Sequence, residues 1–187
     1  LEIAVGDVSD EQRAQAKAIN YGIIYGMGAR RLAKSTGLSL NQAKDFIERY
    51  FAGFPTIREF IDQTITFAEE HGYCLTITGR KRPIEGFRQG GRAMVNARNI
   101  AVNSPLQGSA ADLIKIAMVN ITKQIEQEKM QSKMLLQVHD ELVFECPETE
   151  QEALSKIISQ EMEGAMELEV PLLIQLGVGS NWLEAHQ

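Results

Sequence analysis

Apolar side chains recur every three or four residues through most of the first 72 positions, as they do along the buried face of a helix. Start signals precede these runs: Ser9 with Gln12 has capping-box spacing, Ser39 stands before a later run, and Pro55 opens the last. The pattern predicts a helical lobe with helices at about residues 10–25, 30–36, 41–52 and 55–71.

The pattern changes after residue 72, where strand-like alternation joins the helical spacing. Residues 73–78 alternate with β-branched side chains, and the apolar runs 134–138 and 142–146 flank a polar segment as in a hairpin. Between these strands an amphipathic helix begins near residue 106 and continues to about residue 125. A helix at 148–166 and a strand at 172–178 are expected to follow. The predicted fold class is therefore α+β, a helical lobe followed by part of an antiparallel sheet with packed helices.

Composition is that of a globular protein, since 44% of the 187 residues are hydrophobic and 24% are charged. No apolar run approaches the ~20 residues that a membrane span needs, so no membrane partner is expected. Cys74 and Cys146 fit no metal spacing and indicate free thiols, the alternative being a disulfide. These features predict a cytoplasmic protein.

The distribution of charge matters more than its sum. A net charge of −6 argues against a basic nucleic-acid-binding protein. Residues 79–98 nevertheless contain six Lys or Arg against Glu85 alone, whereas residues 140–169 contain ten carboxylates against Lys156 alone. A basic strip and an acidic face on one chain are typical of an enzyme that grips phosphates and holds metal ions with carboxylates.

A basic or aromatic side chain stands at every fourth residue of the first predicted helix. Arg13, Lys17, Tyr21 and Tyr25 therefore form one stripe, which suits a ligand with a polyphosphate at one end and a flat base at the other. The alternative for the two cations is a solvated surface edge. Two glycines follow the aromatic residues, and each costs roughly 1 kcal/mol inside a helix, so a ligand's close approach is a reason to keep them.

Three further segments carry candidate chemistry. Arg80-Lys81-Arg82 follows a strand and a Gly turn, which suits a phosphate backbone; the alternative is a solvated hairpin. Asn103 and Gln107 stand near the start of the long helix, where amides can meet base edges in the minor groove; the alternative is helix capping. Asp140 and Glu141 lie at a predicted hairpin tip and could face Mg²⁺; the alternative for Asp140 is a turn former.

Four motifs together resemble the family A, bacterial polymerase I-like, DNA polymerases. The spacing Arg-x3-Lys-x3-aromatic-Gly-x2-Tyr-Gly at residues 13–26 resembles motif B, and Gln-Val-His-Asp-Glu at 137–141 resembles motif C. Residues 76–82 resemble the family's Thr-x-x-Gly-Arg-Arg-Arg, and 103–112 its Asn-x-Pro-x-Gln-Gly-x-Ala-Ala-Asp. The ending at 177–186 resembles the family's C-terminal signature and predicts the natural end of the protein.

The match departs from the family pattern at two places. Pro83-Ile84-Glu85 stands where an aromatic-Leu-Pro is usual. Asn99 holds the place of the family's arginine and Arg98 is one residue earlier, so either side chain could take that role. No Asp-Tyr-Ser-x-x-Glu sequence resembling motif A is found. The resemblance thus implies a C-terminal fragment with fingers at 1–72 (motif B helix about 10–25) and part of the palm at 73–187 (motif C hairpin at 134–146), without motif A or the thumb.

The resemblance implies template-directed DNA synthesis, in which a primer 3′-hydroxyl attacks a dNTP by a two-metal mechanism. One of two Mg²⁺ ligands would be Asp140, and the fragment would be inactive without the remaining N-terminal part of the polymerase. The alternative is a non-catalytic DNA- and nucleotide-binding fragment. The implied partners are a DNA primer-template and dNTPs at the bacterial nucleoid. The implied site residues are Lys17, Asp140 and Glu141 for catalysis; Arg13, Lys17, Tyr21, Tyr25 and Gly26 for dNTP; and Arg80, Lys81, Arg82, Arg98, Asn99, Asn103, Gln107 and His139 for DNA.

Overall fold

The computed structural model describes residues 7–186 and divides the chain into two compact units, residues 1–108 and 109–187. The fold class is α+β, as predicted. The division after residue 108 differs from the boundary expected at residue 72, and the names fingers and palm stay predictions. Within the described part of the chain, no helix is both long and apolar enough to cross a membrane.

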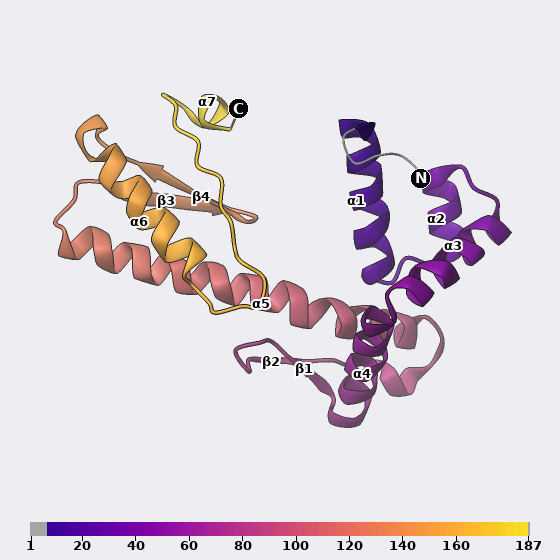
Figure 1. Cartoon of the computed structure of the whole chain (residues 1–187). Helices are drawn as coiled ribbons and strands as arrows, with labels where there is room; N and C mark the ends of the chain where they lie inside the picture. Colours follow the sequence, from indigo (N-terminus) through magenta and orange to yellow (C-terminus); the bar gives the residue numbers. More distant parts are fainter. Residues whose placement is uncertain (1–6, 187) are drawn as a thin grey trace. The chain divides into compact units, whose positions relative to one another are not determined.

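The first unit begins with the predicted helical lobe. Its helices are α1 (Asp10–Ile24), α2 (Ala29–Thr36), α3 (Leu40–Gly53) and α4 (Pro55–His71) (Figure 1). Two reciprocal capping boxes, Ser9 with Gln12 and Ser39 with Gln42, start α1 and α3. Gly37 closes α2 in the left-handed conformation that glycine adopts at little cost. Local sequence therefore determines where these helices begin and end.

A two-stranded antiparallel hairpin packs beside α4. Its strands are β1 (Tyr73–Leu75) and β2 (Lys81–Pro83); β1 contacts α4, and Figure 1 shows the hairpin extending away from the end of that helix. The predicted strand at 73–78 is thus shorter than expected, because Thr76 already bonds across the turn to Arg80. The hairpin and helices enclose a small core of Ala68, Cys74, Ile84, Ala97 and Ala101.

The long helix α5 (Gly91–Gln127) begins about 15 residues before the predicted start and carries Pro105 in its interior. A proline lacks the N–H that would bond to the carbonyl four residues earlier, here that of Ala101. The buried Cys74 thiol donates to this same carbonyl, with Sγ 3.3 Å from the oxygen. Cys74 is accordingly a free thiol with a structural hydrogen bond, as expected, and burial raises its pKa.

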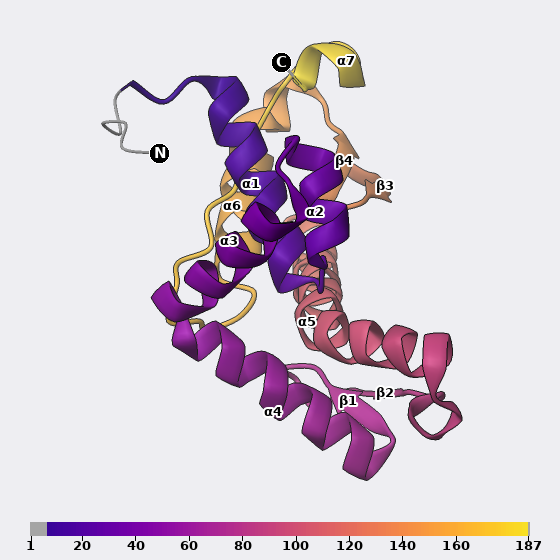
Figure 2. The ribbon, with the colours of Figure 1, turned by 90° about the vertical axis from the view of Figure 1, so that its right-hand side faces the viewer.

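The second unit is built on the C-terminal part of α5. Strands β3 (Lys133–Val138) and β4 (Glu141–Glu145) form an antiparallel hairpin, and α6 (Gln151–Glu163) lies beside α5 in Figures 1 and 2. A short 3-10 helix (Glu148–Glu150) precedes α6. The core of this unit consists of Ala117, Ile121, Ile125, Leu154 and Ile158.

The segment after α6 differs from the prediction. The helix expected to reach residue 166 ends at Glu163, and the strand expected at 172–178 is wrong, because the structure assigns no strand there. A strand needs a partner backbone to accept and donate its hydrogen bonds. Apolar Leu173, Leu176 and Val178 are exposed instead, and the short helix α7 (Trp182–Ala185) follows.

Candidate nucleotide and nucleic-acid site

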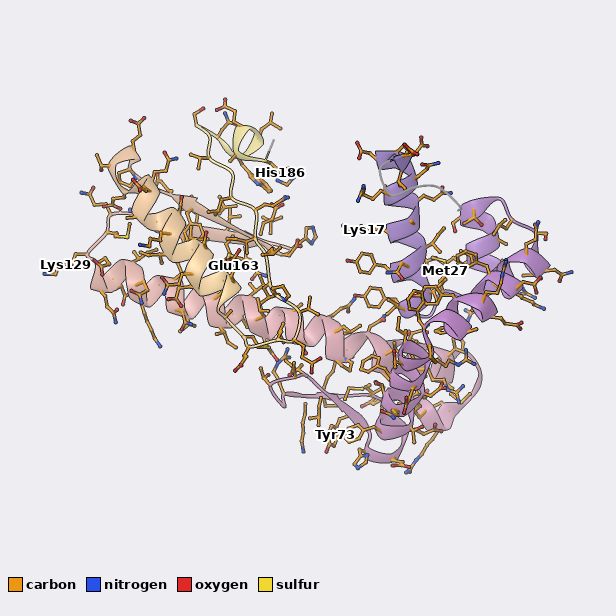
Figure 3. All side chains as sticks on the ribbon, in the orientation of Figure 1. Lys17, Met27, Tyr73, Lys129, Glu163 and His186 are labelled. Atoms are coloured by element: carbon orange, nitrogen blue, oxygen red, sulfur yellow. The ribbon has the colours of Figure 1, made fainter. Side chains whose placement is uncertain are left out.

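The predicted stripe is present: Arg13, Lys17 and Tyr21 lie on α1, and Tyr25 is its C-cap residue. The Lys17 ammonium lies 5.9 Å from the centre of the Tyr21 ring. The Tyr21 and Tyr25 rings stack with centroids 6.2 Å apart and planes within 9°. Arg13 and Lys17 are exposed, and Figure 3 shows Lys17 projecting from α1. The stripe therefore has two cations followed by two aromatic rings, each side chain about one helical turn after the last.

Gly22 in α1 and Gly26 just beyond its end are explained by this chain's own side chains. Gly26 has a φ of 86°, and a Cβ built there would lie 2.6 Å from the Asn99 amide oxygen. At Gly22 a Cβ would collide with the terminal methyl of Met27, which folds back over the helix. The sequence suggested close approach of a ligand as the reason for glycine, whereas in this conformation Met27 and Asn99 fill both spaces.

A cavity of about 240 Å³ opens beside the aromatic end of the stripe. Sequence reasoning missed Met27, Gly28 and Arg31 among its lining residues, although all three follow the motif closely in the chain. Asn99 lines this cavity and a neighbouring one, and Arg98 lines the neighbouring one together with Arg58 and Asp62. The full lining is Tyr21, Gly22, Tyr25, Gly26, Met27, Gly28, Arg31 and Asn99.

The basic hairpin presents its cations on an ordered backbone. Arg80, Lys81 and Arg82 are all exposed. The Arg80 guanidinium donates to the Gly108 carbonyl at 3.1 Å, and the Lys81 ammonium lies 4.4 Å from the centre of the Tyr73 ring. These contacts orient two of the side chains, so the hairpin is more than a disordered solvated loop.

Asn103 and Gln107 lie one turn apart inside α5. Because α5 begins at Gly91, neither residue caps the helix, which removes the structural alternative that the sequence left open. Gln107 is exposed, whereas the Asn103 amide oxygen is buried and has no hydrogen-bond partner among the described residues. A buried acceptor without a donor is rare in native proteins, and the described residues leave this oxygen unpaired.

The hairpin of the second unit raises Asp140 on a tight turn. Val138 pairs with Glu141, which leaves His139 and Asp140 as the two turn residues. His139 has a φ of 54°, an uncommon conformation for a non-glycine residue, and the Gln137 amide donates to its carbonyl at 2.8 Å. Asp140 is exposed, while Glu141 is half-buried as the first residue of β4. A strained, braced turn therefore presents the candidate metal ligand.

The described residues provide only part of a metal site. A carboxylate such as Asp140 is the hard oxygen ligand that Mg²⁺ prefers. Within residues 7–186, however, no three His, Cys, Asp or Glu side chains come close enough together to hold an ion. The candidate nucleotide residues belong to the first unit and the acidic turn to the second, so each part is described within its own unit.

The sequence of this chain is similar to those of known DNA polymerases. The sequence profile of DNA polymerase family A matches residues 1–184. DNA polymerase I of Caldicellulosiruptor bescii is 41% identical over 183 residues, which are 97% of this chain and 22% of that protein. DNA polymerase I of Pseudomonas aeruginosa is 42% identical over 185 residues, 98% of this chain and 20% of that protein.

A solved structure shows the same fold. The polymerase domain of Pol1 from M. smegmatis, in complex with a DNA primer-template and dNTP, superposes with a TM-score of 0.95 at 37% identity. The superposition covers 99% of this chain and 33% of that one. This chain thus spans about a fifth of the length of the curated relatives above. A profile match over nearly every residue, with these relatives, shows that the chain belongs to DNA polymerase family A.

Proposed function

We propose that this chain works as part of a longer DNA polymerase and contributes its nucleotide-binding helix, a DNA-binding surface and one acidic turn. The observation that carries the proposal is the stack of Lys17, Tyr21 and Tyr25 beside a cavity. The reaction is attack of a primer 3′-hydroxyl on the α-phosphate of a dNTP, with release of pyrophosphate. The DNA and dNTP bound to the M. smegmatis relative support this choice.

The α1 face binds the incoming nucleotide. Arg13 and Lys17 hold the triphosphate, because exposed cations one turn apart can contact successive phosphate groups. Lys17 also stabilises the negative charge that develops on the leaving pyrophosphate. Tyr21 packs beside the sugar, and Tyr25 with Gly26 shapes the pocket for the templating base.

The primer-template lies on residues that contact DNA without selecting a sequence. Arg80, Lys81 and Arg82 bind backbone phosphates, which supplies affinity for any sequence. Asn103 and Gln107 meet base edges in the minor groove, where all four base pairs share acceptors. His139 is assigned to the primer terminus. Asn99 takes the role of the family's arginine in place of Arg98, since Asn99 lines the cavity beside Tyr25.

Asp140 is proposed as one of the two carboxylates that hold Mg²⁺, with Glu141 as a neighbouring acid of lesser weight. Two bound ions would lower the pKa of the attacking hydroxyl and neutralise charge on the phosphates. The donor set of the described residues fits one ligand of that pair, and the second aspartate comes from another segment of the polymerase.

The experiment is a single substitution in the complete polymerase that carries this chain. Asp140→Asn should reduce single-nucleotide incorporation by about 100-fold or more, because removing a charged ligand removes electrostatic stabilisation of the transition state. DNA affinity, measured by fluorescence anisotropy, should stay within about twofold, since other residues bind the phosphates. Glu145→Gln, an exposed acid at the far end of β4, is the control. Near-normal incorporation by Asp140→Asn would refute the metal assignment.

A non-catalytic DNA- and nucleotide-binding fragment is the second candidate. It is favoured by the incomplete acid cluster among residues 7–186. Under this alternative, the chain taken alone binds DNA and nucleotide but performs no chemistry.

A further inference from the structure

The segment 177–186 folds back on itself through a dense set of polar contacts. The Glu184 carboxylate accepts hydrogen bonds from the Ser180 backbone N–H at 3.0 Å, the Ser180 hydroxyl at 2.6 Å and the Asn181 amide at 2.9 Å. Asn181 in turn caps α7 by accepting from the Glu184 backbone N–H. These hydrogen bonds lower the pKa of Glu184.

Two glycines make this return possible. A Cβ at Gly177 would overlap the Ala185 carbonyl, and one at Gly179 would lie 2.6 Å from the Glu184 Cβ. The backbone therefore approaches the end of α7 at a distance that only glycine allows. Since α7 is otherwise largely exposed, its own packing does not explain why the segment closes here. A contact made by the end of this segment offers an explanation.

Segment 177–186 places His186 against the acidic turn of the same unit. The ring Nδ1 of His186 lies 3.3 Å from a carboxylate oxygen of Glu141, and its backbone N–H is held by the Trp182 carbonyl at 3.0 Å. Figure 3 labels His186 at this end of the chain. Glu141 directly follows Asp140 and pairs with Val138 at the base of the turn. A residue 45 positions away in sequence thus contacts the neighbour of the proposed metal ligand.

We propose that His186 is a positioning residue that holds the Glu141 carboxylate in one orientation beside Asp140. The side chains are 65% and 40% exposed, and contacts between exposed charged groups add little to stability. Without a partner, a half-exposed glutamate would sample several rotamers. The contact therefore acts on the geometry of the acidic turn and hardly on folding. This inference rests on the proposed polymerase function, because it assigns His186 to that site.

The test uses the complete polymerase with a graded set of substitutions. His186→Leu removes the polar contact, His186→Gln keeps a donor of similar reach, and Leu183→Ala, on an exposed neighbour in α7, is the control. We expect His186→Leu to lower kcat for nucleotide incorporation by about five- to tenfold while the KM for dNTP changes by less than about twofold. His186→Gln should recover most of the loss, and the midpoint of thermal unfolding should not move.

A double-mutant cycle tests whether the effect passes through Glu141. In a Glu141→Gln background, His186→Leu should cause no further loss of kcat, because the two residues act as one unit. Equal kcat values for His186→Leu and the unaltered enzyme, or full additivity with Glu141→Gln, would overturn the inference.

A measurement that needs no activity separates this inference from the proposed function. With ¹³C-labelled histidine, the NMR signal that His186→Gln removes should shift in Glu141→Gln and stay unchanged in Leu183→Ala. A polymerase that extends no primer refutes the proposed function, whatever the NMR result. If the polymerase is active but its His186 signal does not shift in Glu141→Gln, the positioning role is refuted and the proposed function is not.

Discussion

At the scale of single residues, the stripe on α1 is built from contacts that add little to folding. A cation near the face of an exposed tyrosine contributes about 0.5–1 kcal/mol, and the Lys17 ammonium at 5.9 Å is near the outer limit of that interaction. Tyr21 is 48% exposed although it is a large aromatic residue. We proposed above that this stack, continued by cations, binds the incoming nucleotide, because packing alone gives little reason to leave Tyr21 exposed.

Lys17→Ala in the complete polymerase should lower kcat/KM for dNTP by about 10- to 100-fold, because a hydrogen bond to a charged group is removed. Steady-state incorporation kinetics measure this change, and unfolding in urea should show no matching loss of stability. Lys44→Ala, an exposed lysine on α3, serves as the control. Unchanged nucleotide kinetics in Lys17→Ala would contradict the assignment.

At the scale of elements, the end of α1 depends on a glycine that no other residue can replace without strain. Gly26→Ala should destabilise the protein by about 1–2 kcal/mol, because its φ of 86° is left-handed and Asn99 occupies the space of a Cβ. Denaturant unfolding measures the loss. Gly53→Ala, which has open space around it at the end of α3, should be neutral. Equal stability of both variants would contradict the prediction, because it would show that the backbone at Gly26 adjusts to a Cβ without cost.

A second element-scale prediction concerns Glu150, which bridges the loop between α5 and β3. Hydrogen bonds from the Gln131 backbone N–H and from Ser132 lower the pKa of Glu150 below the ordinary glutamate value of 4.5. The folded state therefore favours the ionised form. The stability this adds is complete above about pH 4.5 and is lost as the pH falls through the lowered pKa.

Glu150→Ala should therefore be less stable than the unaltered protein at neutral pH, and the difference should shrink as the pH falls below the ordinary glutamate value. Chemical unfolding at a series of pH values measures the difference. Glu152→Ala, an exposed acid two residues further along the chain, is the control. A difference that stayed constant down to pH 3 would contradict the role given to the carboxylate.

At the scale of the whole molecule, the chain matches about a fifth of the length of its DNA polymerase I relatives. The acidic turn offers Asp140, and the described residues form no complete acid cluster around it. The basic strip is nevertheless present on this chain, although its net charge is −6. We therefore expect binding and chemistry to separate when the chain is taken alone.

The isolated chain should bind primer-template DNA weakly, with an affinity that falls linearly in log–log plots against salt, and should extend no primer. Anisotropy titrations and a primer-extension assay with Mg²⁺ measure the two properties. The complete polymerase is the positive control for extension. Robust extension by the isolated chain would show that its own residues suffice for catalysis.

Local patterns allowed most elements to be predicted from sequence. The capping boxes at Ser9 and Ser39 and the β3–β4 hairpin depend on residues within a few positions of one another, and the structure has them where spacing indicated. The same holds for the α1 stripe, because a step of four residues returns to one helix face. Motif spacing also identified the family, which the profile match confirms.

The sequence by itself thus determined the four N-terminal helices, the β3–β4 hairpin and the family, since these follow from short-range spacing. Only the tertiary structure decided which distant side chains meet: Asn99 beside Gly26, the Cys74 thiol at the Ala101 carbonyl left by Pro105, and His186 at Glu141. It also decided that residues 172–178 form no strand here. Such pairings depend on how packed elements bring distant segments together, and no local spacing encodes that.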